Sequence, residues 1–204
     1  MSVDERVLRA ARTWGHTPAR ERAVERFSRL GEHSAVWLAI GLAGGAIEPR
    51  RRDRWGRATA TVLATYALNT ALKLLVRRTR PQPAGLPALT STPTRLSFPS
   101  AHASTSFAGA YAYSRLGLPG APLYVLAAAL SGSRLYLGVH YPSDVLAGAL
   151  LGSAVAAARE RARASAAFSG ETSATLAGAS SNGHGPGSNG HGPEHSTRAA
   201  GERS

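Results

Sequence analysis

Three groups of polar residues stand at the ends of apolar segments, and their types are those that bind and transfer phosphate. They read Lys73-x6-Arg80-Pro81, Pro99-Ser100-Ala101-His102 and Ser133-Arg134-x5-His140-x3-Asp144. Cations and a helix N-terminus together form a site for a dianionic phosphate. Two histidines supply what remains, since one can attack phosphorus while the other protonates the leaving oxygen. The candidate site therefore comprises Lys73, Arg80, Ser100, His102, Arg134, His140 and Asp144.

Asp144 has one catalytic and two structural interpretations. It lies four residues after His140, within reach of the far ring nitrogen if this segment turns into a helix, and it would then fix the histidine tautomer. Alternatively it balances the charge of Arg134, or it caps the helix expected over 145–158.

The charge distribution argues against metal-dependent chemistry. The 204-residue chain has a formal net charge of +12, and its 24 basic residues are all Arg except Lys73. From Arg54 to Arg159 there are ten basic residues and a single carboxylate, Asp144. A two-metal hydrolase needs several carboxylates at one site, so we expect neither a metal nor another cofactor. Cysteine is absent, which excludes disulfides and a thiolate nucleophile.

Five apolar runs, 35–47, 58–76, 103–118, 122–139 and 145–158, predict the elements that position these residues. They are rich in Ala and Gly and carry almost no charge on any face, whereas a helix of a soluble bundle shows a polar stripe. The sequence therefore predicts an all-α, integral-membrane bundle of about five helices. In an up-and-down bundle, the end of the second run, the start of the third, the end of the fourth and the start of the fifth share one face. All three motifs meet there.

The polar ends of the chain flank this bundle. Residues 1–34 are Arg-rich, with apolar residues at helical spacing, and predict an amphipathic helical region before a membrane domain over 35–164. After Arg163 the chain becomes rich in Ser, Gly, Asn and His and contains a duplicated heptad, 181–187 and 188–194. Residues 165–204 are therefore expected to be a disordered tail.

In their order and spacing, the three motifs resemble those of the type 2 phosphatidic acid phosphatase (PAP2) superfamily. The resemblance covers about residues 35–158, with one departure, because the family often has Gly where this chain has Ala101. It implies that His140 forms a phosphohistidine, that Asp144 orients it and that His102 is the general acid. The remaining site residues would hold the phosphoryl oxygens: Lys73, Arg80, Ser100 and Arg134.

A narrower resemblance rests on the short, Arg-rich chain and on residues 31–34 before the first apolar run. These features are similar to actinobacterial PAP2 proteins that act on decaprenylphosphoryl-5-phosphoribose in cell-wall synthesis. The resemblance implies a lipid phosphate substrate in the cell membrane. Undecaprenyl pyrophosphate, phosphatidylglycerol phosphate and phosphatidic acid are the alternative substrates. Related enzymes place the site outside the cytoplasm, whereas the Arg counts near the two faces do not decide the orientation.

Three other classes of function compete with this interpretation. Vanadium haloperoxidases share the motifs, but they are larger and soluble. A nucleic-acid-binding module would show basic residues interleaved with aromatics, whereas Arg here clusters at the ends of apolar runs, where lipid headgroups lie. A catalytically inactive lipid-binding relative is disfavoured because no motif position is lost.

Overall fold

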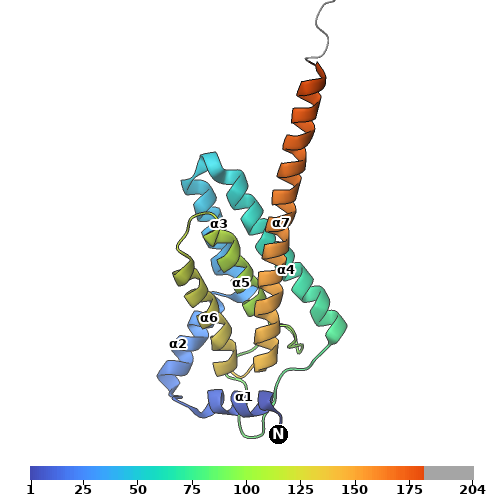
Figure 1. Cartoon of the computed structure of the whole chain (residues 1–204). Coiled ribbons are helices and arrows are strands. Elements are labelled where there is room, and N and C mark those ends of the chain that lie inside the picture. Colours follow the sequence, from blue (N-terminus) through green and yellow to red (C-terminus); the bar gives the residue numbers. More distant parts are fainter. Residues whose placement is uncertain (182–204) are drawn as a thin grey trace, which may run out of the picture. The chain divides into compact units, whose positions relative to one another are not determined.

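The computed structural model describes residues 1–181, most of which are helical. Met1–Arg163 form one compact unit, and the expected all-α class is confirmed (Figure 1). The five apolar runs correspond to five of the helices, and the N-terminal region adds two more. Over the described residues the helices are α1 (Val3–Thr13), α2 (Pro18–Arg29), α3 (Ala35–Ile47), α4 (Arg52–Val76), α5 (Ala101–Ser114), α6 (Gly120–Tyr136) and α7 (Pro142–Ser181), with 3-10 turns at Glu32–Ser34 and Pro49–Arg51.

The amphipathic region over 1–34 is two helices because its sequence carries two start signals. Ser2 caps α1 in a capping box with Glu5. Thr17 caps α2, and the first residue of that helix is Pro18. On α1, Leu8 is buried against the protein, whereas Trp14 is 86% exposed. This helix lies across the end of the bundle at which α7 begins (Figure 1).

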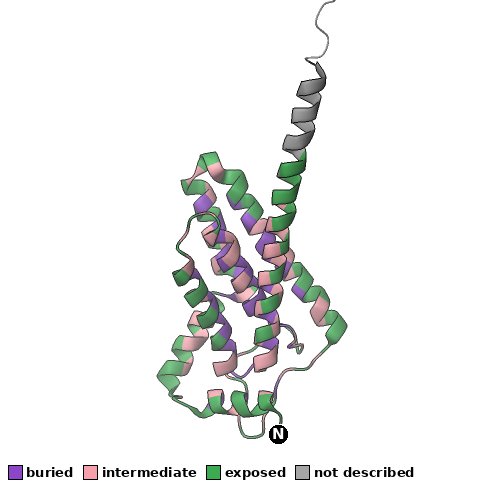
Figure 2. Cartoon of the chain, in the orientation of Figure 1, coloured by how far each residue is buried: buried purple, intermediate pink, exposed green. Residues whose placement is uncertain are grey.

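A cluster of large aromatic rings packs α3, α4 and α5 together inside the bundle that they form with α6. Trp37 and Trp55 stack on Tyr113, with ring centroids 6.4 and 5.8 Å away. The indole of Trp37 donates a 2.9 Å hydrogen bond to Ser106, and Tyr113 donates one of 2.8 Å to the Trp37 carbonyl. Buried residues follow the inward sides of these helices (Figure 2). The cluster therefore fixes the helices whose ends carry the candidate site.

Helix α7 packs closely on α5 because two glycines of α7 face the backbone of α5. A Cβ at Gly148 would lie 2.5 Å from the Ser100 carbonyl oxygen, and one at Gly152 would lie 2.0 Å from the Ser104 carbonyl oxygen. Backbones approach this closely only where the side chain is absent. This contact brings the start of α7 beside the start of α5, as the expected topology requires.

The outer surface of the bundle is apolar in a way that fits a lipid environment. Among the described residues, Pro49–Val76 is the one helical stretch long and apolar enough to cross a membrane, and only 22% of its apolar window is buried. The bent pair Pro18–Arg29 with Glu32–Ile47 passes the same test when taken together. Helices α3, α5 and α6, with 13, 14 and 17 residues, are shorter than the roughly 20 that a perpendicular crossing needs. Several crossings therefore stay a prediction.

The structure places the first part of the expected tail, residues 165–181, in helix α7. Helix α7 continues to Ser181, because Ala-rich sequence without proline sustains a helix through this stretch. The Asn, His and Pro residues that break helical sequence lie in the duplicated heptad. Apart from Ser181, that repeat lies outside the described residues.

The glycine contact between α5 and α7 gives a first testable expectation. Gly152→Ala should lower the melting temperature in detergent by several degrees, because the added methyl overlaps the backbone of α5 and overpacking costs about 1–3 kcal/mol. The matched control is Gly132→Ala on α6, where a Cβ meets nothing within 4 Å. The control should keep or raise the melting temperature, since Ala favours helix by about 1 kcal/mol over Gly. Equal melting temperatures for the two variants would contradict the close packing.

Candidate active site

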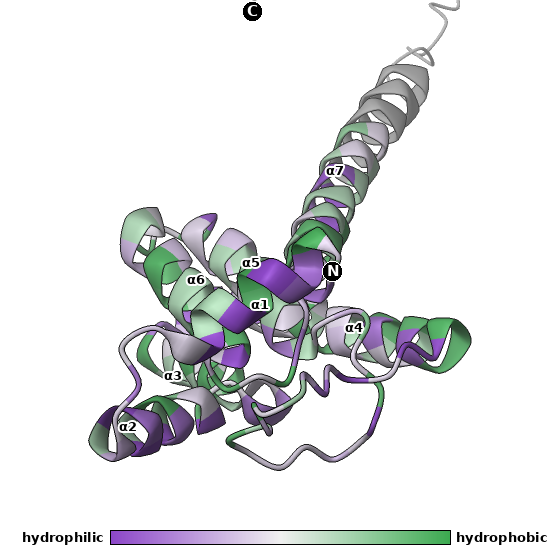
Figure 3. Ribbon diagram, turned by 90° about the horizontal axis from the view of Figure 1, so that it is seen from below, coloured by the Kyte–Doolittle hydropathy of each residue, from purple (hydrophilic) through white to green (hydrophobic). Residues whose placement is uncertain are grey.

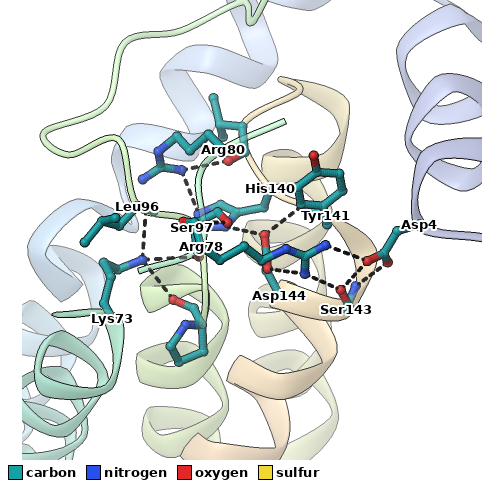
Figure 4. A network of polar contacts seen from close by, with 12 residues as sticks. Asp4, Lys73, Arg78, Arg80, Leu96, Ser97, His140, Tyr141, Ser143 and Asp144 are labelled. Carbon is teal, nitrogen blue, oxygen red and sulfur yellow. Dashed lines mark hydrogen bonds and ion pairs between the residues drawn. The ribbon is translucent and has the colours of Figure 1, made fainter. Parts of the chain in front are cut away.

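The structure brings all three motifs together at one end of the bundle, as expected. The first motif spans the end of α4 and the loop after it, the second opens α5, and the third joins α6 to α7. Hydrogen bonds connect them: Arg80 reaches His140, Lys73 reaches the Pro99 carbonyl and the Ser100 amide donates to the Asp144 carbonyl. These hydrogen bonds hold the loop from residue 77 to residue 100 against the end of α4 and against the segment that opens α7 (Figure 4).

His140 is held as a neutral imidazole with a defined tautomer. Its Nε2 lies 3.1 Å from Arg80 Nη1, and because a guanidinium can only donate, Nε2 accepts and its lone pair is free of a proton. The proton is then on Nδ1, which lies 3.5 Å from Asp144 Oδ2. That separation is longer than a strong hydrogen bond, so the carboxylate acts on the ring mainly through its charge. Gly138, with φ of 75°, provides the reversal before this histidine.

Burial determines the charge states on either side of this contact. His140 is 2% exposed, and burial lowers its pKa to about 3, with Arg80 adding to the effect and Asp144 opposing it. Burial also lowers the pKa of Arg80 to about 10, which leaves its guanidinium charged at neutral pH. A neutral ring with an unprotonated Nε2 is the state of histidine that can attack phosphate.

Asp144 is fully buried, and its carboxylate is satisfied by two groups besides His140. Its Oδ1 accepts from Arg78 Nη1 at 2.9 Å, and its Oδ2 accepts from the Tyr141 amide at 2.9 Å. Tyr141 immediately precedes α7, so Asp144 occupies the third helical position and reaches back, as in a capping box. The capping alternative is therefore correct, except that Asp144 caps from the third helical position. The charge-balancing alternative named the wrong cation, because Asp144 pairs with Arg78 and not with Arg134.

Arg78 is a residue that the sequence motifs did not reveal. Its guanidinium lies between two carboxylates, donating to Asp144 and, through Nη2 at 2.9 Å, to Asp4 on α1 (Figure 4). It also lies 4.0 Å over the ring of Tyr141. These contacts outweigh the effect of burial and raise the pKa of Arg78. No spacing rule could connect it with Asp4, which is 74 positions away.

The residues predicted to bind phosphate differ in how many hydrogen bonds they already make within the protein. Lys73 Nζ donates to the carbonyls of Leu96, Ser97 and Pro99 at 3.0–3.3 Å, so it holds the loop before α5. In contrast, Ser100 Oγ and Arg134 Nε are buried without a hydrogen-bond partner among the described residues. Buried polar atoms without partners carry a cost unless a ligand satisfies them. These two groups are therefore suited to contact phosphoryl oxygens.

His102 is turned toward the N-terminal region. It is 8% exposed, and its Nε2 donates a 3.0 Å hydrogen bond to the Ser28 carbonyl on α2. The hydroxyl of Ser28 accepts from Arg134 Nη1 at 2.7 Å. Ser28 is the second residue that sequence reasoning missed, because a lone serine in an amphipathic helix carries no catalytic signal.

An open cavity of about 1270 Å³ lies beside the site, over the loop that follows α4. Arg80 and Val139 are on its wall, so it reaches the residues around His140. Most of its lining is polar or proline, including Gln82, Arg95 and the threonines Thr79, Thr90, Thr92 and Thr94. Within the part of the chain that the structure describes, no group of three His, Asp or Glu side chains could hold a metal ion.

Comparisons with known proteins identify the family of the chain. The family model of the PAP2 superfamily matches residues 54–164, more than half of the chain. The chain therefore belongs to the PAP2 superfamily, and it is a phosphatase. It is 43% identical over 144 residues to decaprenylphosphoryl-5-phosphoribose phosphatase of Mycobacterium tuberculosis, covering 67% of this chain and 80% of that protein. The protein of the same name from Mycolicibacterium smegmatis is 43% identical over 122 residues, covering 59% of this chain and 67% of that one.

Two solved structures are similar in fold. LpxE of Aquifex aeolicus superposes with a TM-score of 0.67 at 24% identity, covering 79% of this chain and 96% of that one. A transmembrane PAP2-type phosphatidylglycerolphosphate phosphatase from Bacillus subtilis gives a TM-score of 0.63 at 26% identity, covering 79% and 85%. The predicted PAP2-like helical bundle is thereby confirmed.

The buried carboxylate provides the test of the site geometry. Asp144→Asn retains an oxygen for the Tyr141 amide but loses the negative charge behind His140 Nδ1. Turnover should fall by at least about a hundredfold, because a histidine in the wrong tautomer or without its carboxylate loses on the order of 10⁴-fold. The measurement is kcat with a lipid phosphate in detergent, alongside the melting temperature.

The matched control for this variant is Asp53→Asn, an exposed position in the first turn of α4. It should leave both turnover and melting temperature unchanged. Near-normal turnover of Asp144→Asn with a lowered melting temperature would assign the carboxylate to helix capping alone.

Proposed function

We propose that the chain removes the phosphate monoester of decaprenylphosphoryl-5-phosphoribose, a polyprenyl lipid of cell-wall synthesis, through a phosphohistidine at His140. The observation that carries the mechanism is the unprotonated Nε2 of His140, which accepts from Arg80 while Asp144 lies behind the protonated Nδ1. The two mycobacterial relatives of the same name support the substrate.

The reaction has two steps in this geometry. His140 Nε2 attacks phosphorus, the bond to the ribose oxygen breaks, and protonated His102 gives that oxygen its proton. Asp144 stabilises the imidazolium that forms on the attacking ring. His102 then removes a proton from water, which attacks the phosphohistidine, releases inorganic phosphate and restores His140.

The cations hold the phosphoryl group through both steps. Arg80 lies 3.1 Å from the attacking nitrogen, so a phosphoryl group at that nitrogen lies against its guanidinium. Ser100 Oγ and Arg134 Nε supply donors that the protein leaves unpartnered within the described residues. Lys73 supplies charge and fixes the loop. Positive charge around the transferring group stabilises the transition state without a metal ion.

The cavity beside Arg80 supports a substrate with a polar headgroup. A phosphoribose joined to a lipid phosphodiester needs space and hydrogen bonds next to the reacting phosphate. The threonines and Gln82 provide hydrogen-bonding groups, and Arg95 provides a positive charge for the phosphodiester. Phosphatidic acid, which has only a phosphate at this position, would leave these groups unused.

The proposal places the protein in the cell membrane as a multi-pass protein with its site on the extracytoplasmic face. Exposed leucines on α4, Leu63, Leu68, Leu74 and Leu75, would contact lipid tails. Helix α1 has 11 residues, too few to span a bilayer, and it shows alternating polar and apolar stretches across the site end of the bundle (Figure 3). It is therefore suited to lie in the interface, where the exposed Trp14 would meet headgroups.

A panel of lipid phosphates tests the proposal. Phosphate release in detergent should have the highest kcat/KM with decaprenylphosphoryl-5-phosphoribose, above undecaprenyl pyrophosphate, phosphatidylglycerol phosphate and phosphatidic acid. Activity should persist in excess EDTA, because cations of the protein hold the phosphate, and vanadate should inhibit by imitating pentacoordinate phosphorus. Higher kcat/KM with another member of the panel would overturn the substrate. Loss of activity in EDTA that Mg²⁺ restores would overturn the mechanism.

A further inference from the structure

We infer that the N-terminal helices α1 and α2, which lie outside the region matched by the family model, are working parts of the active site. Ser28 on α2 is assigned as a positioning residue for the phosphate-binding Arg134 and the acid His102. Asp4 on α1 is assigned the same kind of role for the start of α7. The inference rests on the proposed function, because it concerns how that site is held.

Ser28 contacts two site residues through two different atoms. It is 1% exposed, its hydroxyl oxygen accepts from Arg134 Nη1 at 2.7 Å, and its carbonyl oxygen accepts from His102 Nε2 at 3.0 Å. The hydroxyl also lies 3.0 Å from Ser133 Oγ, the residue before Arg134. One residue of α2 therefore connects the opening of α5 with the end of α6.

The hydrogen bond to the Ser28 hydroxyl fixes the orientation of the Arg134 guanidinium. Arg134 is 4% exposed, and a long side chain loses much rotamer freedom when it is held in one geometry. With Nη1 bound to Ser28, the buried Nε has no partner among the described residues and is left for a phosphoryl oxygen. Without the hydroxyl, a buried charged group would lose a partner and the guanidinium would be free to turn.

The carbonyl contact decides which nitrogen of His102 carries out proton transfer. Because Nε2–H is donated to the Ser28 carbonyl, the proton for the leaving oxygen must come from Nδ1. That carbonyl lies near the C-terminal end of α2 and holds the Nε2–H of His102. Gly31 lies against the same edge of the ring, since a Cβ there would lie 2.6 Å from His102 Cδ2 and 3.1 Å from Nε2.

Asp4 provides the corresponding contact from α1. It accepts from the Ser143 amide at 3.0 Å and from Arg78 Nη2 at 2.9 Å, and Arg78 in turn binds Asp144. Burial alone would raise the pKa of Asp4, but the bonds from Ser143 and Arg78 outweigh it and keep that pKa low. The carboxylate therefore stays charged at neutral pH and ties α1 to the first turn of α7.

The first experiment compares Ser28→Ala with Ser114→Ala, a serine whose hydroxyl bonds only within its own helix at the far end of α5. In purified full-length protein, Ser28→Ala should raise the inhibition constant for vanadate and the KM by about tenfold or more, the loss expected for one hydrogen bond to a charged group. Ser114→Ala should change neither. A vanadate constant for Ser28→Ala within twofold of wild type would overturn the positioning role.

A double-mutant cycle separates positioning from a general loss of structure. In the Arg134→Ala background, Ser28→Ala should have little further effect on the vanadate constant, since the group it positions is gone. Full additivity of the two substitutions would show that Ser28 acts elsewhere and would overturn the inference.

Gly31→Ala tests the His102 arm separately, because its methyl would displace the ring. It should reduce kcat most for substrates with poor leaving groups and least for p-nitrophenyl phosphate, whose leaving group is an acidic phenol. The inhibition constant for vanadate should stay near that of the wild type. Equal loss of kcat on both kinds of substrate would contradict the assignment of the acid nitrogen.

Asp4→Asn tests the α1 arm, with Asp53→Asn as the exposed control. Asp4→Asn should lower kcat about tenfold and leave the inhibition constant for vanadate within twofold of the wild-type value. The reason is that it loosens Asp144 and does not affect the basic residues that hold the phosphate. An unchanged kcat would remove α1 from the site. In every arm, absence of phosphate release by the wild-type protein would refute the proposed function itself, whereas normal wild-type activity with unaffected variants would refute only this inference.

Discussion

The burial of Asp144 beside His140 is the constraint on which the rest of the site depends. A carboxylate with no exposed surface is tolerable only if charged or strongly donating groups surround it, and here Arg78 and the Tyr141 amide do so. The negative charge of Asp144 also acts on His140 Nδ1. Burial keeps this histidine neutral, and its Nε2 is unprotonated. Moving Asp144 by an ångström would disturb its ion pair, the start of α7 and the tautomer of the nucleophile together. The helix, the loop and the chemistry are therefore coupled through one side chain.

Small residues and the N-terminal helices satisfy this constraint from two sides. The glycines of α7 let it approach the backbone of α5, which sets Asp144 beside the opening of that helix. From the other side, α1 and α2 bring Asp4 and Ser28 against groups that the motifs alone would leave free. The PAP2 domain of this chain is in that sense completed by residues outside its motifs.

Sequence reasoning predicted the elements and the convergence of the three motifs at one end of the bundle, because motif spacing and apolar runs are local properties. The placement of Lys73, Arg80 and His140 at one end followed from the alternation of helix ends. The partners of these residues could not be predicted in the same way. Arg78 pairs with Asp4 across 74 positions, and Ser28 meets Arg134 across 106, so both depend on tertiary packing. The length of α7 was missed because composition over 165–204 was averaged, although the helix-breaking residues begin only near Ser181.

The central claim is that His140 is the nucleophile, and a covalent intermediate tests it most directly. Wild-type protein would be mixed with substrate, quenched within milliseconds in alkaline denaturant and digested for mass spectrometry under conditions that preserve phosphohistidine. With p-nitrophenyl phosphate, whose leaving group needs no acid, the His102→Ala variant should accumulate more of the intermediate, because its water is no longer activated. The account predicts an added phosphate on the peptide that contains His140, in both proteins, and none in His140→Ala. Phosphate on another residue, or turnover with no phosphopeptide in either protein, would contradict it.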